Sequence, residues 1–149
     1  MIADALVAAR TAAREHGDYD ALVQLIPFAG FLGVRLILAD GQPRSHLPFR
    51  PGLIGNASLP ALHGGVTASF MENAALLHLL LHGDEPRIPK SIDFSIDYLL
   101  PGLARDCYAD CEVSRAGLRV AQTQIRCWQK SPQAPIAIAR AHFLLTPPE

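Results

Sequence analysis

The sequence has few cysteines, few charged residues and no hydrophobic run long enough to cross a bilayer. Its three cysteines are an odd number and form no CxxC pair, so neither a disulfide framework nor a structural zinc site is expected. We expect small core residues with free thiols, as in the reducing cytoplasm. The longest apolar stretch is interrupted by Glu72, His78 and His82, which makes it too short for a transmembrane helix.

An excess of charge of one sign is also lacking. The chain has 13 Lys and Arg against 14 Asp and Glu, and the basic residues are dispersed. No nucleic-acid-binding surface is therefore expected. The N-terminal segment carries Asp4 early and its arginines late, which is the wrong order for a secretory signal and indicates an amphipathic helix. We expect a cytoplasmic protein without a nucleic-acid or membrane partner.

The chain is long and apolar enough to form one compact domain, 149 residues of which 50% are hydrophobic. No internal repeat, low-complexity tract or linker divides it. The patterns predict two N-terminal helices within residues 1–30, a β-hairpin, a long Pro/Gly-rich loop, one apolar helix and four more β-segments. In chain order the predicted ranges are 2–15, 19–28, 31–39, 43–49, the loop 50–62, the helix 65–82, and strands 90–100, 105–115, 119–129 and 136–145.

The last four segments have the residue alternation of β-strands. On the strand after the apolar helix, Ile92, Phe94, Ile96 and Tyr98 are expected on one face. The final strand has an alanine-rich face, which allows a helix backbone to approach closely. The helix itself is apolar almost all round, so other structure must cover most of it. An antiparallel sheet curled around this helix, which is an α+β fold, would bury the apolar face of each of these segments. The pattern does not determine the strand order.

One carboxylate stands alone in the apolar helix. Glu72 is the only formally charged residue between Gly64 and Gly83, and an ionised group there must be either satisfied by a partner or used. His78 and His82 lie four residues apart, a spacing that suits a metal. No acidic third ligand accompanies them on the helix, so we expect no metal. A glycine turn before the helix, together with Glu72, predicts a reaction site.

These residues, in this order, resemble the hotdog-fold acyl-CoA thioesterases of the phenylacetate-pathway (PaaI-like) type, from about residue 31 to residue 145. A lone HGG would be weak evidence, but three signatures occur at the right spacing. They are His63-Gly64-Gly65 with Glu72 nine residues after the histidine and then Asn73; the strand Ser91–Leu99 closed by Pro101-Gly102; and the hairpin Ser114–Arg119.

The resemblance implies roles for the helix residues. The backbone N–H of the second glycine, Gly65, is the expected donor to the thioester carbonyl, because a helix N-terminus has free N–H groups and a partial positive charge. Glu72 is the expected nucleophile or general base. His63 and Gly64 form the turn, with His63 orienting it, and Asn73 is the fifth expected catalytic residue.

Further residues are assigned by the same resemblance. Ser91 matches a serine or threonine that assists the substrate or the attacking water. Asn56 matches an asparagine that binds substrate, although it precedes His63 by seven residues rather than six. Lys90, Arg115 and Arg119 are the basic residues expected to meet CoA phosphates.

The spacing of Gly65 and Glu72 favours a homo-oligomer. Seven residues of helix separate them by roughly 10 Å along the axis, so Glu72 faces the Gly65 of a partner subunit more easily than its own. The resemblance implies a dimer or a dimer of dimers, hydrolysis of an acyl-CoA, and no cofactor. Two alternatives stay open: an acyl-thioester hydratase or dehydratase, and a non-catalytic protein that binds acyl-CoA or fatty acid.

Overall fold

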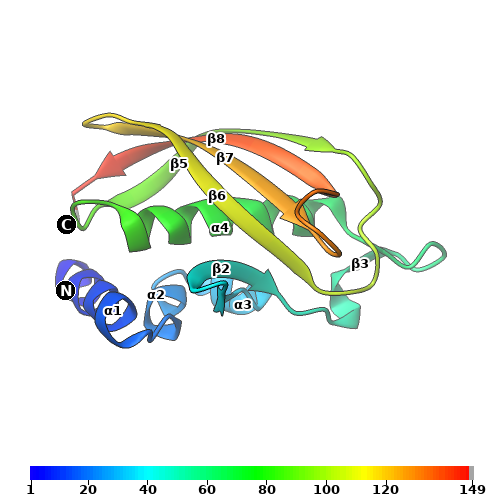
Figure 1. Ribbon diagram of the computed structural model, residues 1–149, viewed down its shortest axis with the longest axis horizontal. Coiled ribbons are helices and arrows are strands. Elements are labelled where there is room, and N and C mark those ends of the chain that lie inside the picture. Colours follow the sequence, from blue (N-terminus) through cyan, green and yellow to red (C-terminus); the bar gives the residue numbers. More distant parts are fainter. Residues whose placement is uncertain (148–149) are drawn as a thin grey trace.

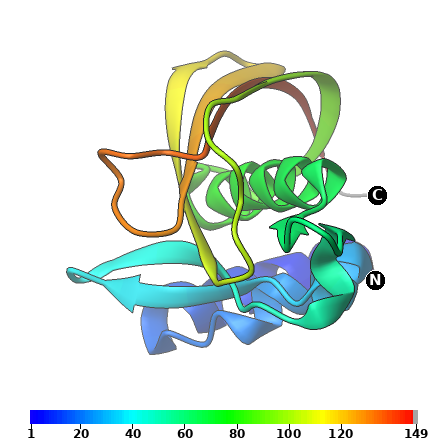
Figure 2. The ribbon, with the colours of Figure 1, turned by 90° about the vertical axis from the view of Figure 1, so that its right-hand side faces the viewer.

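The computed structural model describes residues 1–147 and has three layers (Figure 1). A six-stranded antiparallel sheet forms the first layer, the long helix α4 (Gly64–His82) the second, and three N-terminal helices the third. Residues 148 and 149, the end of the predicted domain, lie outside the described part. The α+β hotdog architecture expected from the sequence is confirmed: the sheet curls over α4, as the end-on view shows (Figure 2).

The sheet order is β1-β2-β6-β7-β8-β5, so β1 and β5 are the two edges. Every neighbouring pair is antiparallel. Two hairpins and a final strand would fit several orders, which is why periodicity alone does not determine it. The strands are β1 (Arg35–Ala39), β2 (Gln42–Leu47), β5 (Ile88–Tyr98), β6 (Cys107–Ala116), β7 (Val120–Trp128) and β8 (Ala137–Thr146).

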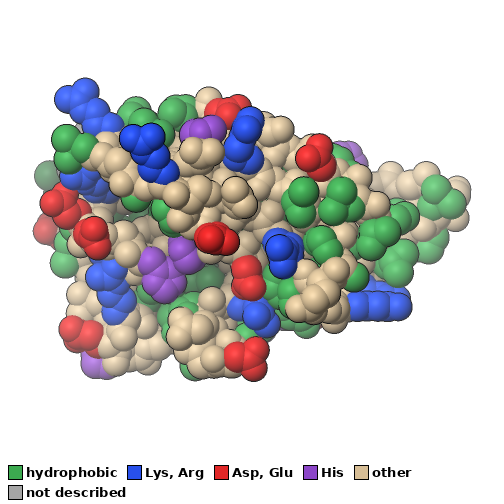
Figure 3. Space-filling model, turned by 45° about the horizontal axis from the view of Figure 1, so that its top comes forward, with side chains coloured by type: hydrophobic (Ala, Val, Ile, Leu, Met, Phe, Trp, Pro, Cys, Tyr) green, Lys and Arg blue, Asp and Glu red, His purple; other side chains and the backbone are tan. Residues whose placement is uncertain are grey.

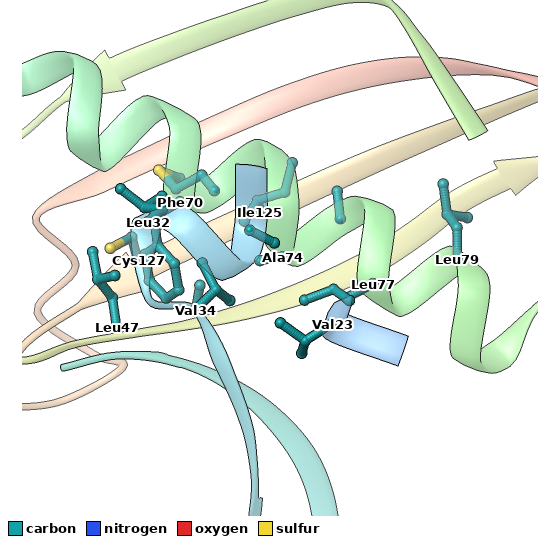
Figure 4. Close-up of a cluster of buried hydrophobic side chains, with 14 of the residues drawn as sticks. Val23, Leu32, Val34, Leu47, Phe70, Ala74, Leu77, Leu79, Ile125 and Cys127 are labelled. Carbon is teal, nitrogen blue, oxygen red and sulfur yellow. The ribbon is translucent and has the colours of Figure 1, made fainter. Parts of the chain in front are cut away.

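The core lies on both sides of α4 (Figure 4). Phe70, Ala74 and Leu77 of α4 are buried together with Ile125 and Cys127 of β7. The alternation predicted for the last strands is confirmed, because every second residue of β7 from Ala121 and of β8 from Ala137 to Phe143 is buried. Small side chains on β8 leave room for the helix, as the alanine-rich face indicated.

The N-terminal helices cover the side of α4 that the sheet leaves open. They are α1 (Ile2–His16), α2 (Asp20–Gln24) and α3 (Pro27–Leu32). Two arginines of α1 bind carbonyls at the end of α4 and in the loop that follows it: Arg14 Nε donates to the Leu81 carbonyl of α4 at 2.7 Å, and the Arg10 guanidinium donates to the Glu85 carbonyl of the loop at 2.7 Å. Cations are favourable at a helix C-terminus, where four carbonyls lack helical partners.

Two predicted segments in the first third of the chain were wrong in their limits. The single helix expected at 19–28 is two helices, and the strand expected at 31–39 begins only at Arg35. Residues 31 and 32 complete α3 instead. Pro27 at the first turn and the left-handed Gly33 at the end, with φ 90°, delimit this helix, and both are ordinary helix boundary residues.

The expected loop at 50–62 contains regular structure. It holds a 3-10 turn, η1 (Pro51–Leu53), and a small hairpin of β3 (Ile54–Asn56) and β4 (Ala61–Leu62). This hairpin leads directly into α4 and positions the turn where the helix begins.

The strand after α4 also differs from its prediction. Its alternation is interrupted by a register shift between Ser91 and Asp93, so the skipped Ile92 is 58% exposed instead of facing the core. Tyr98, at the other end of β5, is 55% exposed. Phe94 and Ile96 pack against the core as expected.

The surface carries charges of both signs. In the view of Figure 3 basic and acidic side chains are interspersed, without a broad patch of either sign. None of the helices within residues 1–147 is long and apolar enough to span a membrane.

Candidate active site

The turn that begins α4 is held by its own histidine. His63 is the N-cap residue, with extended backbone angles of φ −61° and ψ 131°, and its Nδ1 accepts a hydrogen bond from the Gly65 N–H at 2.9 Å. The His63 carbonyl accepts from the Val66 N–H at 2.9 Å. Two of the helix's first N–H groups are thus satisfied inside the turn.

Gly64 provides the free donor of this turn. Its N–H makes no hydrogen bond to any of residues 1–147, and the residue is exposed. Gly65, the donor expected from the sequence, is instead engaged by the His63 ring. The free N–H points from the positive end of a 19-residue helix, which is a favourable place for a developing oxyanion.

The neighbouring hairpin fixes where His63 sits. The His63 N–H donates to the Leu53 carbonyl at 2.9 Å. Gly55 packs so closely that a Cβ there would lie 2.7 Å from the His63 Cα, so only glycine fits. Asn56 lies beside this contact, but its Oδ1 accepts from the Ser58 N–H at 3.0 Å. That side chain forms a local turn rather than pointing freely into the site.

Tyr98 joins the turn from the end of β5. Its hydroxyl donates to the Gly64 carbonyl at 2.7 Å. Sequence reasoning placed Tyr98 on the same face of its strand as Phe94 and Ile96 and missed this contact. A signal was present, because a strand that follows α4 and runs back along it must end near the beginning of that helix.

Glu72 lies on an open stripe of α4, which we define as Gly65, Ala68, Ser69, Glu72 and Leu76. All five residues are exposed or half-buried in this chain. The Glu72 carboxylate is half-buried and forms no ion pair with any of residues 1–147. A buried arginine partner, the structural alternative for this carboxylate, is therefore not found within the described chain.

Asn73 faces a different side of α4. It is 2% exposed, and its Nδ2 donates to the Ser69 carbonyl one turn earlier at 2.8 Å. Its Oδ1 is buried without a partner among the described residues. Consecutive helical residues point about 100° apart, so Asn73 and Glu72 do not converge on one point within this chain.

The remaining predicted residues lie far from the glycine turn. Seven residues of β5 separate Ser91 from Tyr98, or roughly 23 Å of strand. Lys90, Arg115 and Arg119 belong to the same distant end, beside the C-terminus of α4, where the Arg87 guanidinium donates to the Leu118 carbonyl of the β6–β7 hairpin. Figure 1 shows this hairpin and β3 at opposite ends of α4.

Three hollows accompany α4. One of about 380 Å³ lies beside the glycine turn and is lined by Gly64, Thr67, Tyr98 and Gly102 among others. Two of about 410 and 460 Å³ lie at the other end of the helix, and both are lined by His78 and His82.

The two histidines at this end of α4 are close together. Burial lowers the pKa of His78 to about 4, with the neighbouring His82 as a second cause. Within residues 1–147 no cluster of three metal-ligating side chains occurs.

The cysteines are free thiols. Cys107 and Cys127 are buried on β6 and β7, and Cys111 is half-buried. Burial raises the pKa of the Cys111 thiol to about 12, with Asp110 and Glu112 adding to the shift. A thiol of that pKa is a poor nucleophile at neutral pH.

Known proteins resemble this chain in sequence and in fold. The thioesterase superfamily model matches residues 59–136. The medium/long-chain acyl-CoA thioesterase YigI of Escherichia coli K12 is 32% identical over 135 residues, covering 80% of this chain and 86% of YigI. A Chromobacterium violaceum crystal structure is 38% identical with a TM-score of 0.72, covering 94% of this chain and 98% of that one. A Bacillus halodurans protein crystallised with CoA shares the fold at 18% identity, with a TM-score of 0.68 and coverage of 99% and 93%.

Proposed function

This chain belongs to the thioesterase superfamily of hotdog-fold enzymes, and from that premise we propose that it hydrolyses an acyl-CoA thioester to a free acid and CoA. The observation that carries the proposal is Glu72, the one formally charged residue of α4, which is half-buried and has no ion-pair partner among residues 1–147. Such a group is costly to the fold, and a role in catalysis accounts for its presence.

The Gly64 N–H is our proposed donor to the thioester carbonyl. It has no hydrogen-bond partner in the described part of the chain and belongs to an exposed residue at the positive end of α4, whereas the Gly65 N–H is already bound to His63. As the carbonyl carbon is attacked, negative charge develops on its oxygen, and an N–H fixed in place stabilises that charge without reorganising. This assignment moves the donor one residue from the position expected from the sequence.

Glu72 acts as nucleophile or as general base toward water. It follows Gly64 by eight residues, about 12 Å along the helix axis, which is too far for both groups to hold one carbonyl. We therefore propose that the Gly64 of one subunit and the Glu72 of its partner form each site.

Two features of the chain support such a dimer. The edge strand β5 is 11 residues long and exposes apolar side chains at Ile92 and Tyr98, and long open edges of this kind are usually paired or covered. The open stripe of α4 begins with three small residues, which permit another helix to approach closely. A twofold axis beside β5 would bring the two α4 helices together in opposite directions.

The same symmetry would account for the distance between the glycine turn and the predicted residues at the other end of α4. In a dimer with antiparallel α4 helices, the C-terminal half of one helix lies toward the N-terminus of the other. Ser91, Lys90 and Arg115 would then serve the site at the partner's glycine turn, with Lys90, Arg115 and Arg119 near the CoA phosphates. We propose a medium- or long-chain acyl group, following the name of the Escherichia coli relative, and a cytoplasmic location suited to free thiols.

The test is the release of free thiol from a panel of acyl-CoAs of increasing chain length. We expect turnover by the wild-type protein and a loss of at least about 100-fold in kcat for Glu72→Gln, since general bases contribute that much or more. Binding of a non-hydrolysable acyl-CoA analogue should survive. Glu15→Gln, which changes an exposed helical carboxylate of α1 in the same way, is the matched control.

The two alternative functions give different results in this experiment. A hydratase would release no thiol from any acyl chain but would add water to an enoyl-CoA. A binding protein would bind the acyl-CoA analogue but show no turnover, both as the wild type and as Glu72→Gln. Unchanged thiol release by Glu72→Gln would make the carboxylate structural and remove the proposed mechanism.

A further inference from the structure

Three groups at the start of α4 form one hydrogen-bonded chain. The Tyr98 hydroxyl donates to the Gly64 carbonyl at 2.7 Å, and the Gly65 N–H donates to the His63 Nδ1 at 2.9 Å. The Gly64 carbonyl and the Gly65 N–H belong to the same peptide unit. The tyrosine hydroxyl is therefore connected to the imidazole through a single peptide group.

The direction of this chain sets the state of the ring. An imidazole nitrogen that accepts a hydrogen bond carries no proton, so neutral His63 has its proton on Nε2. Hydrogen bonds in a chain polarise one another. Donation by Tyr98 to the Gly64 carbonyl makes the Gly65 N–H a stronger donor, and this holds the ring more firmly.

The surroundings hold the backbone of His63 in place. The His63 N–H is bound to the Leu53 carbonyl, and Gly55 packs against the His63 Cα. On the other side, the Leu99 N–H donates to the Ile136 carbonyl at 2.8 Å, which ties the end of β5 to the residue before β8. Tyr98 and His63 are thus held from two different parts of the fold.

We propose that Tyr98 is a positioning residue that acts on His63 through the Gly64–Gly65 peptide. It keeps His63 in one tautomer, with the proton on Nε2. It also keeps the Gly64 carbonyl turned toward β5, which fixes the glycine turn that presents the Gly64 donor. The inference rests on the proposed function, because its catalytic part needs a thioester at this turn.

Tyr98→Phe tests the proposal, because it removes one hydroxyl and keeps the ring. By ¹⁵N NMR of the imidazole we expect one His63 tautomer, protonated at Nε2, in the wild type and a mixture of both in the variant. The Gly65 amide signal should also shift toward a weaker hydrogen bond. We expect kcat to fall about 3- to 10-fold, the effect of one neutral hydrogen bond, with KM nearly unchanged.

Tyr108→Phe is the matched control, since the Tyr108 ring stacks on His46 of β2 and its hydroxyl is not part of the hydrogen-bonded chain between Tyr98 and His63. It should alter neither the His63 signals nor kcat. An unchanged His63 tautomer and Gly65 amide in Tyr98→Phe would overturn the hydrogen-bonded chain. Altered NMR signals with unchanged kcat would overturn the positioning role.

Failure of the proposed function would be visible separately. If the wild-type protein released no thiol from any acyl-CoA, the NMR comparison would still decide whether Tyr98 sets the His63 tautomer. The melting temperature separates positioning from a loss of stability. If Tyr98→Phe lost activity because it was less stable, its Tm would be lower. A fall in kcat at unchanged Tm supports positioning.

Discussion

At the scale of single residues, Gly64 allows a direct test of the proposed oxyanion donor. It is the first residue of α4, and the residue before it, His63, has extended backbone angles. Proline is well accepted at the first helical position, and the residue before a proline prefers extended angles. Gly64→Pro therefore removes the proposed N–H donor while leaving the helix start intact. We expect kcat to fall about 100- to 1,000-fold, as for other lost oxyanion donors.

Gly64→Ala separates loss of the N–H from crowding. Its Cβ would lie 3.3 Å from the Tyr98 hydroxyl, a tight contact, but the N–H remains. Steady-state kinetics on the same acyl-CoA should show a clearly smaller loss for alanine than for proline. Equal losses in the two variants would mean that space, and not the N–H, matters at this position.

The same residues show what the sequence can reveal about a site. The spacing of His63, the glycines and Glu72 is visible in the sequence and was enough to locate the turn and the carboxylate. Which glycine N–H is free depends on the rotation of the His63 ring, and that is set by Gly55, Leu53 and the turn geometry. No linear pattern encodes the rotation of a ring. Tyr98 was missed although its place at the end of the strand that follows α4 put it near the start of that helix.

At the scale of elements, periodicity predicted best where one face is fully buried. β6, β7 and β8 were found because their apolar residues alternate against one core, and α4 was found as a long run that is apolar almost all round. α3 was missed because its six residues are too few for a helical period. The bulge of β5 was missed because a register shift leaves no trace in alternating residues.

Helix α4 also carries an acid-sensitive pair. The His78 and His82 ring centroids are 4.5 Å apart, and burial lowers the pKa of both imidazoles, that of His78 to about 4. The facing groups on other elements are Arg14 of α1, which opposes protonation of His82, and Asp110 of β6, which favours protonation of His78.

The sign of the pH effect follows from this lowered pKa. Between about pH 6.5 and pH 4 the unfolded chain binds a proton at residue 78 that the folded chain does not. The free energy of unfolding should therefore be highest above pH 6.5 and decrease as the pH falls toward 4. Urea titrations at pH 7.5 and pH 5 measure it. His78→Gln should flatten this dependence more than His82→Gln does, and the opposite ranking would place the acid sensitivity elsewhere.

At the scale of the whole molecule, one chain does not bring the proposed catalytic groups together. The glycine turn and Glu72 are about 12 Å apart along the same helix, and the basic residues lie at the far end of α4. The N-terminal helices already cover the side of α4 opposite the sheet. The open stripe of α4 and the edge of β5 are therefore the surfaces left for a second subunit to complete the site.

Complementation between two inactive variants tests this shared site. A heterodimer of a Gly64→Pro chain and a Glu72→Gln chain has one site with both groups altered and one with both intact. Purified through two different affinity tags, it should recover about half of the wild-type kcat per dimer, while each homodimer stays inactive. Size-exclusion chromatography with light scattering measures whether the protein is the proposed dimer. A heterodimer as inactive as its parents would mean that Gly64 and Glu72 of the same chain must act together, and the twofold arrangement beside β5 would then be wrong.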